Sequence, residues 1–224
     1  MSQAKNYFAW QGHLVKSEIG RRVIEIGCGV GNFTAMLLES EAVIALDKEP
    51  ACIQQLKQRY LNQPNLKALT CDAEALDKHQ AELAEFAADS CICLNVLEHI
   101  ADDAKALRAM ATILQPAGVI VLLVPAFPAL YGPIDQNLGH HRRYTRSSIE
   151  KLAKSAGLRL KKAHYMNCLG FFGWWLNSHI LKREVQSETQ IAAFDSLVPL
   201  LSKIEAVAHP PFGQSVFAVL KKPC

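Results

Sequence analysis

Hydrophobic residues along this chain fall into short runs separated by longer stretches of mixed polarity. Five runs are rich in β-branched or other apolar residues and have the length of buried strands: Arg22–Ile26, Ala42–Leu46, Leu66–Thr70, Ser90–Leu94 and Gly118–Val124. The stretches between these runs carry apolar residues at helical spacing. Strands that alternate with helices predict a parallel sheet that is covered by helices on both faces.

The last third of the chain departs from this rhythm. Residues 146–157 predict a helix that ends at a glycine, and residues 158–167 alternate like an exposed or edge strand. Residues 215–222 predict a final strand, and the segment 168–210 before it has a helical pattern with aromatic residues at its beginning. We therefore expect a single α/β domain over residues 1–224: a doubly wound, mostly parallel, seven-stranded sheet with a helical insertion before its last strand.

Composition narrows the classes of function. A net charge of +3 over 224 residues is too small to indicate nucleic acid as the main partner. The seven cysteines are scattered and odd in number, which favours buried thiols in a reducing cytosol over a disulfide framework. No group of residues has the spacing of metal ligands, so we expect no metal.

We expect a cytoplasmic protein. The N-terminal residues lack the apolar core of a signal peptide, and no window of about 18 continuous apolar residues would span a membrane. The aromatic segment 168–181 leaves two further options open, which are contact with a membrane surface and pairing with a second copy. The expected state is a monomer or a homodimer.

A glycine-rich turn follows the first predicted strand. Gly27, Gly29 and Gly31 stand two residues apart, and a helical segment opens at Asn32. Such a turn at the carboxyl end of a parallel strand brings the backbone close to a nucleotide. The dinucleotide fingerprint is G-x-G-x-x-G, whereas the spacing here is G-x-G-x-G, with Glu25 two places before the first glycine. A carboxylate there would oppose a pyrophosphate and suit a ligand that carries positive charge.

The segment EIGCGVG, residues 25–31, resembles motif I of the class I S-adenosylmethionine-dependent methyltransferases. In that family the acidic residue helps to hold the methionine part of the cofactor, and the glycines let the loop pack beneath it. Three later segments agree with the resemblance: Asp47 at the position of the ribose hydroxyls, Asp72 near the adenine amino group, and CLNVLEHI at 93–100, beside the sulfonium and methyl group. Residues 114–127 resemble the following turn and fifth strand.

This resemblance covers roughly residues 20 to 126 and implies a Rossmann-like methyltransferase fold that uses S-adenosyl-L-methionine and releases S-adenosyl-L-homocysteine. It divides the domain into an N-terminal helix or lid (1–20), a cofactor-binding core (21–126) and a substrate-side part with the insertion and final strands (127–224). The residues that it assigns to the cofactor are Glu25, Gly27, Cys28, Gly29, Gly31, Asp47, Lys48, Asp72, Ala73, Asn95, Val96 and His99.

The densest group of reactive side chains on the acceptor side is LGHHRRYT, residues 138–145. Its two arginines and tyrosine could bind a carboxylate or phosphate together, and an imidazole beside them suits removal of a hydroxyl proton near neutral pH. We favour His141 slightly over His140 as that base. The alternatives are a solvated basic loop, or a helix start whose arginines pair with surface carboxylates. The loop resembles the GHxRRY segment of a subgroup of small-molecule methyltransferases of type 11 or 12, whose acceptors are diverse.

Other candidates on the acceptor side have a structural alternative. His99 could act on the acceptor or cap the next helix, and the aromatic residues of 171–175 could line an apolar pocket or pack the insertion onto the sheet. Tyr7 and Trp10 could form part of a lid or a packing stripe. The candidates for catalysis are His141, His140 and His99. The candidates for acceptor binding are Tyr7, Trp10, His140, His141, Arg142, Arg143, Tyr144 and Trp174.

The leading hypothesis is methyl transfer to a small molecule, on an oxygen, with an anionic or polar group of the acceptor held by residues 140–144. An acceptor in nucleic acid is disfavoured by the low charge and by NVLEHI at the place of a D/N-P-P-Y segment. The glycine spacing disfavours a nicotinamide oxidoreductase. Two alternatives remain: a protein acceptor, and a regulatory protein that binds the cofactor without transferring a methyl group.

Overall fold

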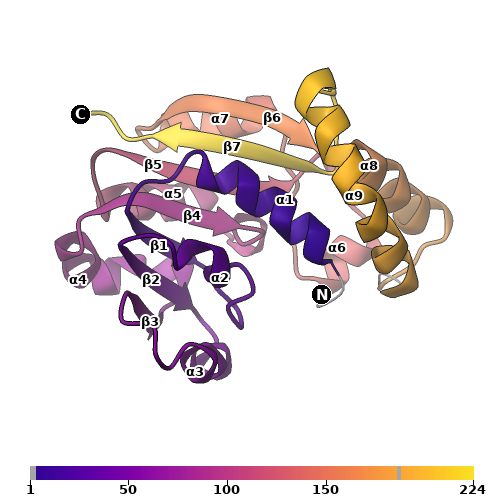
Figure 1. Ribbon diagram of the computed structural model, residues 1–224. Helices are drawn as coiled ribbons and strands as arrows, with labels where there is room; N and C mark the ends of the chain where they lie inside the picture. Colours follow the sequence, from indigo (N-terminus) through magenta and orange to yellow (C-terminus); the bar gives the residue numbers. More distant parts are fainter. Residues whose placement is uncertain (1–3, 186–187) are drawn as a thin grey trace.

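A seven-stranded sheet with helices on both faces forms the centre of the molecule (Figure 1). The computed structural model describes residues 4–185 and 188–224. The strands are β1 (Arg22–Ile26), β2 (Ala42–Asp47), β3 (Leu66–Thr70), β4 (Ala88–Leu94), β5 (Leu114–Pro125), β6 (Arg159–Met166) and β7 (Ser215–Lys221). The main helices are α1 (Lys5–Lys16), α2 (Thr34–Leu37), α3 (Pro50–Arg59), α4 (Gln80–Glu85), α5 (Asp103–Thr112), α6 (Pro133–Asn137), α7 (Arg146–Ser155), α8 (Cys168–Trp175) and α9 (Glu188–Ala208).

The strand order is β3-β2-β1-β4-β5-β7-β6, and β7 runs antiparallel to both of its neighbours. The predicted fold class is confirmed, including the edge strand β6 and the helices before β7. The winding reverses between β1 and β4. In open α/β sheets a ligand binds outside the carboxyl ends of the strands at this reversal. The topology therefore places a site beside the turns that follow β1 and β4.

The strands read as continuous apolar runs because both faces of the sheet are buried. On one face Ile24 and Ile44 belong to a large core that also holds side chains of α5 and α7. On the other face Val23 and Val43 pack in a second cluster with side chains of α1 and α2. Alternate residues of a strand point to opposite faces, so each strand needs apolar residues at successive positions.

The helical insertion before β7 meets the N-terminal helix. Asp195 of α9 is buried and accepts hydrogen bonds from the backbone N–H groups of Asn6 (3.1 Å) and Tyr7 (2.9 Å) at the start of α1. These bonds satisfy N–H groups that a helix cannot pair internally. Figure 1 shows α1 lying along the sheet with its N-terminal end beside α9. Among the described residues, no helix is long and apolar enough to cross a membrane.

Candidate active site

The glycine-rich turn after β1 has one packed side and one open side. Gly27, Gly29 and Gly31 all have positive φ, at +76°, +53° and +82°. A Cβ on Gly27 would lie 2.2 Å from Cγ2 of Val96, so the turn packs tightly against the loop after β4. At Gly29 no described atom beyond the glycine and its two chain neighbours lies within 4 Å of the position of a Cβ. The backbone at Gly29 is therefore open to close approach by a ligand.

Asp47, at the end of β2, is oriented by backbone groups beside this open turn. Its Oδ2 accepts a hydrogen bond from the N–H of Gly29 at 2.7 Å, and its Oδ1 accepts one from the N–H of Glu49 at 2.9 Å. A carboxylate has about four acceptor positions. Each oxygen of Asp47 therefore keeps the capacity to accept a bond from a hydroxyl group of a ligand.

Glu25 is a buried carboxyl group directly before the turn. Its Oε2 accepts a hydrogen bond from the hydroxyl of Thr34 at 2.6 Å. Burial raises the pKa of Glu25 to about 7, the charge of Asp47 adds to this, and the bond from Thr34 opposes it. A cationic group of a ligand at this position would favour the ionised form.

Replacing Glu25 with Gln should change how the free energy of unfolding depends on pH. The ordinary pKa of the carboxyl is 4.5, whereas in the folded protein it is about 7. Between these values the unfolded state loses the proton first, so rising pH removes roughly 2–3 kcal/mol of stability from the wild-type protein. The free energy of unfolding of Glu25→Gln does not have this pH-dependent decrease. Urea unfolding at about pH 5 and pH 8 should therefore show that the stability of the variant, relative to the wild type, is higher at pH 8 than at pH 5. An identical pH response of both proteins would contradict this assignment.

The other residues predicted to bind the cofactor lie at the same edge of the sheet. Asp72 is exposed at the end of β3, and Ala73 is half-buried beside it. Lys48 follows β2 and is close enough for its charge to contribute to lowering the pKa of His99. Asn95 follows β4 with a positive φ of 53°, a conformation that Asn adopts more readily than most residues. Lys48 and His99, which follow β2 and β4, thus lie near enough to each other to interact electrostatically.

The arginines and tyrosine of the HHRRY segment do not form the predicted open fork. Arg143 and Tyr144 are buried. Nε of Arg143 donates to Oδ1 of Asp135 at 2.8 Å, and its guanidinium lies 4.4 Å from the ring centroid of Trp174. The hydroxyl of Tyr144 donates to Asp103 at 3.0 Å. Both side chains are thus engaged by other residues of the chain, and their binding of an anionic acceptor stays a prediction.

Arg142 and the aromatic candidates are also held by neighbouring residues. Nη1 of Arg142 lies 2.8 Å from Oδ2 of Asp103, so the arginine follows the alternative of pairing with a carboxylate of the chain. Trp174 is buried, and its ring packs beneath Arg143. Tyr7 and Trp10 contact each other edge to face and belong to the packing beneath α1. Contact of these side chains with an acceptor stays a prediction.

Asp135 was not predicted from the sequence, although it organises this part of the site. Its Oδ2 accepts from the N–H of Gly132 at 3.1 Å, and its Oδ1 lies 2.8 Å from Nδ1 of His140 and receives Nε of Arg143. Burial acts to raise the pKa of Asp135, but the bond with His140 and the charge of Arg143 outweigh it and lower the pKa. The available signal was Gly-Pro-x-Asp, which is typical of a helix start.

Three predicted catalytic histidines gather around Glu98. The rings of His99 and His140 are 4.7 Å apart between centroids and nearly perpendicular. The N–H of His141 donates to the carbonyl oxygen of Glu98 at 2.8 Å. Burial lowers the pKa of His99, and the charges of His140, Lys48 and His141 add to that effect. The fold therefore brings these histidines together at the carboxyl end of β4.

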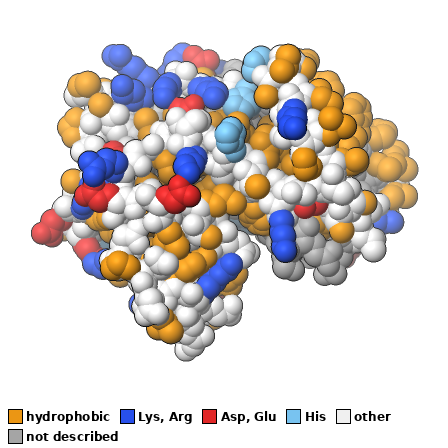
Figure 2. All heavy atoms as spheres, in the orientation of Figure 1, with side chains coloured by type: hydrophobic (Ala, Val, Ile, Leu, Met, Phe, Trp, Pro, Cys, Tyr) orange, Lys and Arg blue, Asp and Glu red, His pale blue; other side chains and the backbone are white. Residues whose placement is uncertain are grey.

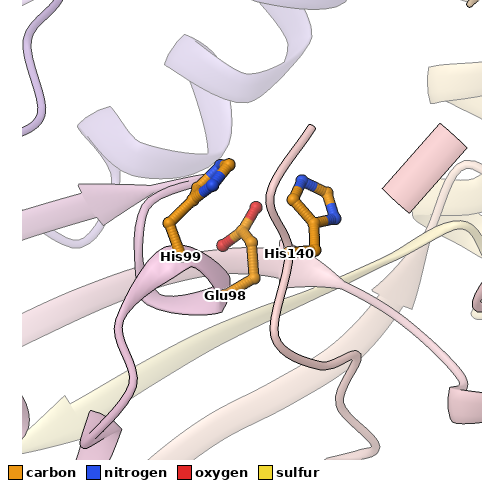
Figure 3. Close-up of side chains that lie close together, drawn as sticks. All are labelled: Glu98, His99 and His140. Carbon is orange, nitrogen blue, oxygen red and sulfur yellow. The ribbon is translucent and has the colours of Figure 1, made fainter. Parts of the chain in front are cut away.

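The side chain of Glu98 is buried beside the two rings (Figure 3). Burial raises the pKa of Glu98 to about 8, against a hydrogen bond with its own backbone and the charge of Arg143. Its Oε2 has no hydrogen-bond partner within the part of the chain that the structure describes. Glu98 is thus a strongly perturbed buried carboxyl group in a cluster of imidazoles, which is typical of functional sites.

Comparison with known proteins agrees with this geometry. A sequence model of the family described as a methyltransferase domain matches residues 8–163. This chain belongs to that family. The matched range includes the glycine turn, the ends of β2 to β4 and the histidine cluster. The predicted family, enzyme class and cofactor, S-adenosylmethionine, are confirmed. The resemblance of residues 139–144 to a GHxRRY subgroup stays a prediction.

Among relatives, a ubiquinone biosynthesis O-methyltransferase from Albidiferax ferrireducens is 32% identical over 112 residues, which are 49% of this chain and 42% of the relative. The chain spans less than half the length of the first curated relatives it matches. An S-adenosylmethionine-dependent methyltransferase from Mesorhizobium loti has the same fold, with a TM-score of 0.64 at 13% identity over 99% of both chains. The N-methyltransferase NodS from Bradyrhizobium japonicum WM9, solved with S-adenosyl-L-homocysteine, has a TM-score of 0.58 at 16% identity over 96% of this chain and 85% of NodS.

The structure of this methyltransferase fits its cofactor at three places. The open face of Gly29 permits close approach to the backbone, Asp47 keeps acceptor positions beside it, and buried Glu25 offers a carboxyl group with a raised pKa. These groups match a ligand that carries vicinal hydroxyls and a positive charge. The contribution of each residue stays a prediction.

Proposed function

We propose that this methyltransferase transfers a methyl group to a hydroxyl oxygen of a small molecule. The observation that carries the proposal is that His99 and His140 lie beside Glu98 at the end of β4 (Figure 3), where the backbone N–H of His141 also donates to the carbonyl oxygen of Glu98. Methyl transfer to a hydroxyl requires loss of a proton, whereas transfer to a neutral amine does not require a base to begin. A cluster of imidazoles at the acceptor side suits the first reaction.

The residues around the turn hold the cofactor in this proposal. Asp47 accepts hydrogen bonds from the two ribose hydroxyls, and Glu25 faces the ammonium group of the methionine part. Asp72 lies near the amino group of the adenine. Val96 and the turn pack together and give the pocket a rigid floor. When it is bound, S-adenosylmethionine supplies an electrophilic methyl group. The chain's task is then to align the acceptor oxygen and to remove its proton.

His141 is the proposed base, and His99 and His140 orient the hydroxyl. The side chain of His141 is exposed, and it is near enough for its charge to act on His99. Its backbone is tied to Glu98, which keeps the loop at the cluster. Asp135 holds the ring of His140 through Nδ1, so the lone pair that can face the acceptor side lies on Nε2.

The acceptor is expected to have an apolar part. Large hydrophobic side chains are exposed along α8, α9 and the segment between them, and Figure 2 shows them over that end of the molecule. The set comprises Leu169, Phe172, Trp175, Leu176, Ile180, Leu181, Val185, Leu197, Leu200, Ile204 and Val207. Relatives that are described as O-methyltransferases of ubiquinone biosynthesis support an oxygen acceptor. A cytoplasmic location, the absence of a nucleic-acid partner, and contact with a membrane surface or a second copy stay predictions.

Calorimetry and an acceptor screen test the proposal. Titration with S-adenosyl-L-homocysteine should show one micromolar site, and NADH should show none. Methyl transfer from S-adenosylmethionine should then be screened on matched pairs of apolar acceptors that differ in a hydroxyl or an amino group. Transfer to hydroxyl compounds alone supports the proposal. Transfer to amines alone would overturn the oxygen assignment, and cofactor binding without any transfer would favour a regulatory protein.

His141→Gln should lower kcat by about 10²–10⁴-fold at neutral pH, because it removes the group that accepts the hydroxyl proton. Affinity for S-adenosyl-L-homocysteine should be unchanged, since the residue lies on the acceptor side. His13→Gln, at an exposed histidine of α1, is the matched control and should keep the wild-type kcat. Steady-state kinetics with a hydroxyl acceptor measure the effect. An undiminished kcat would remove His141 from the role of base.

A further inference from the structure

Glu98, His99 and His140 offer a set of ligand atoms that no sequence spacing revealed. One carboxylate oxygen and two imidazole nitrogens from these residues all lie within 4.8 Å of one another. Figure 3 shows the carboxylate of Glu98 pointing between the two rings. Its Oε2 is buried and has no hydrogen-bond partner among the described residues. A buried carboxylate oxygen ordinarily has a hydrogen bond or a cation to compensate for lost water.

We propose that these three side chains bind one divalent transition-metal ion, with Zn²⁺ as the best match. Two imidazoles and one carboxylate are a donor set of catalytic zinc sites, which leave a fourth position for water or substrate. Mg²⁺ and Ca²⁺ prefer oxygen ligands only. Ligand atoms on tetrahedral zinc lie about 3.4 Å apart at bond lengths of about 2.0–2.2 Å. Because the His99 side chain is exposed, its ring has room to move toward that spacing when an ion binds.

Asp135 supports this assignment from behind His140. Its Oδ1 lies 2.8 Å from Nδ1 of the histidine, so the proton is placed on Nδ1 and the lone pair on Nε2. A carboxylate that holds the far nitrogen of a metal-binding histidine recurs in zinc sites.

The role of the ion rests on the proposed oxygen methylation. A hydroxyl of the acceptor in the open position would become more acidic, as water does on zinc. Its proton passes to His141 and from there to solvent. The oxygen then forms a bond to the methyl carbon while the carbon–sulfur bond breaks, and the sulfur keeps that electron pair as a neutral thioether. The ion thus explains why a buried carboxylate and two histidines lie where the acceptor oxygen is expected.

Metal binding can be measured without cofactor or acceptor. The full-length protein is freed of metal with a chelator and titrated with Zn²⁺ in equilibrium dialysis and with Co²⁺ by visible absorption. We expect one ion per chain and a tetrahedral Co²⁺ spectrum without thiolate charge-transfer bands. His99→Gln and His140→Gln should each weaken binding at least tenfold. His13→Gln, an exposed histidine outside the cluster, should bind as the wild type does.

The possible outcomes separate this inference from the proposed function. A far-UV circular dichroism spectrum like that of the wild type shows that each variant is folded. Saturable binding that falls in both cluster variants and not in His13→Gln supports the site. Absence of saturable binding, equal binding by all variants, or thiolate bands from the cysteines overturns the site, even where methyl transfer persists. Metal binding without affinity for S-adenosyl-L-homocysteine would overturn the proposed function and leave the site standing.

Discussion

Arg143→Ala is expected to lower the free energy of unfolding by about 3–5 kcal/mol, because it leaves a buried carboxylate without its guanidinium partner. Arg143 and Asp135 are both buried, and Nε of the arginine lies 2.8 Å from Oδ1 of the aspartate. The substitution also removes the cation from the face of the Trp174 ring, 4.4 Å away. Urea unfolding followed by circular dichroism measures the change.

The neighbouring arginine provides the matched control. Arg142 pairs with Asp103 at 2.8 Å, but its side chain is 32% exposed. An ion pair at that level of exposure contributes at most about 1 kcal/mol, so Arg142→Ala should cost far less stability than Arg143→Ala. If Arg143→Ala unfolds like the wild type and raises only the KM for the acceptor, then the arginine binds substrate as the sequence had predicted and its ion pair is dispensable.

Asp47→Ala is expected to weaken binding of S-adenosyl-L-homocysteine by about 2–4 kcal/mol, which corresponds to roughly a 30- to 1,000-fold rise in Kd. Two effects combine in this loss. The proposed bonds to both ribose hydroxyls disappear, and the N–H of Gly29 loses the carboxylate oxygen that it contacts at 2.7 Å. Loss of this hydrogen bond destabilises the turn conformation in which Gly29 is open to the ligand.

Asp47→Asn separates these two effects. Its amide oxygen can still accept from the N–H of Gly29, but the charge and one of the two ribose acceptors are gone. Calorimetry should therefore place its Kd between those of the wild type and Asp47→Ala. Asp77→Ala, at an exposed carboxylate that has no assigned role in cofactor binding, should leave the Kd unchanged. Wild-type affinity in both Asp47 variants would overturn the assignment of this residue to the cofactor.

The strands and the glycine turn were predictable because their signals lie in consecutive residues. β1 and β3 have the predicted bounds, and β2 is longer by one residue. A strand that is buried on both faces needs an apolar residue at nearly every position, which is visible in the sequence. The positive φ values of the turn favour glycine, and glycine stands at those positions. The family resemblance rested on the same segments, and the match over residues 8–163 confirms it.

The acceptor side depends on contacts between segments that are distant in the chain. Arg143 was expected to face a ligand, but α6 carries Asp135 beneath it and turns the guanidinium inward. Glu98 and His99 meet His140 only because the loop after α6 returns across the end of β4. Neither contact follows from a characteristic spacing of the residues in the sequence, because the packing of the intervening segments decides which side chains meet. The chain's pattern thus specifies the cofactor edge of this methyltransferase, and three-dimensional packing specifies which polar groups face one another where the acceptor binds.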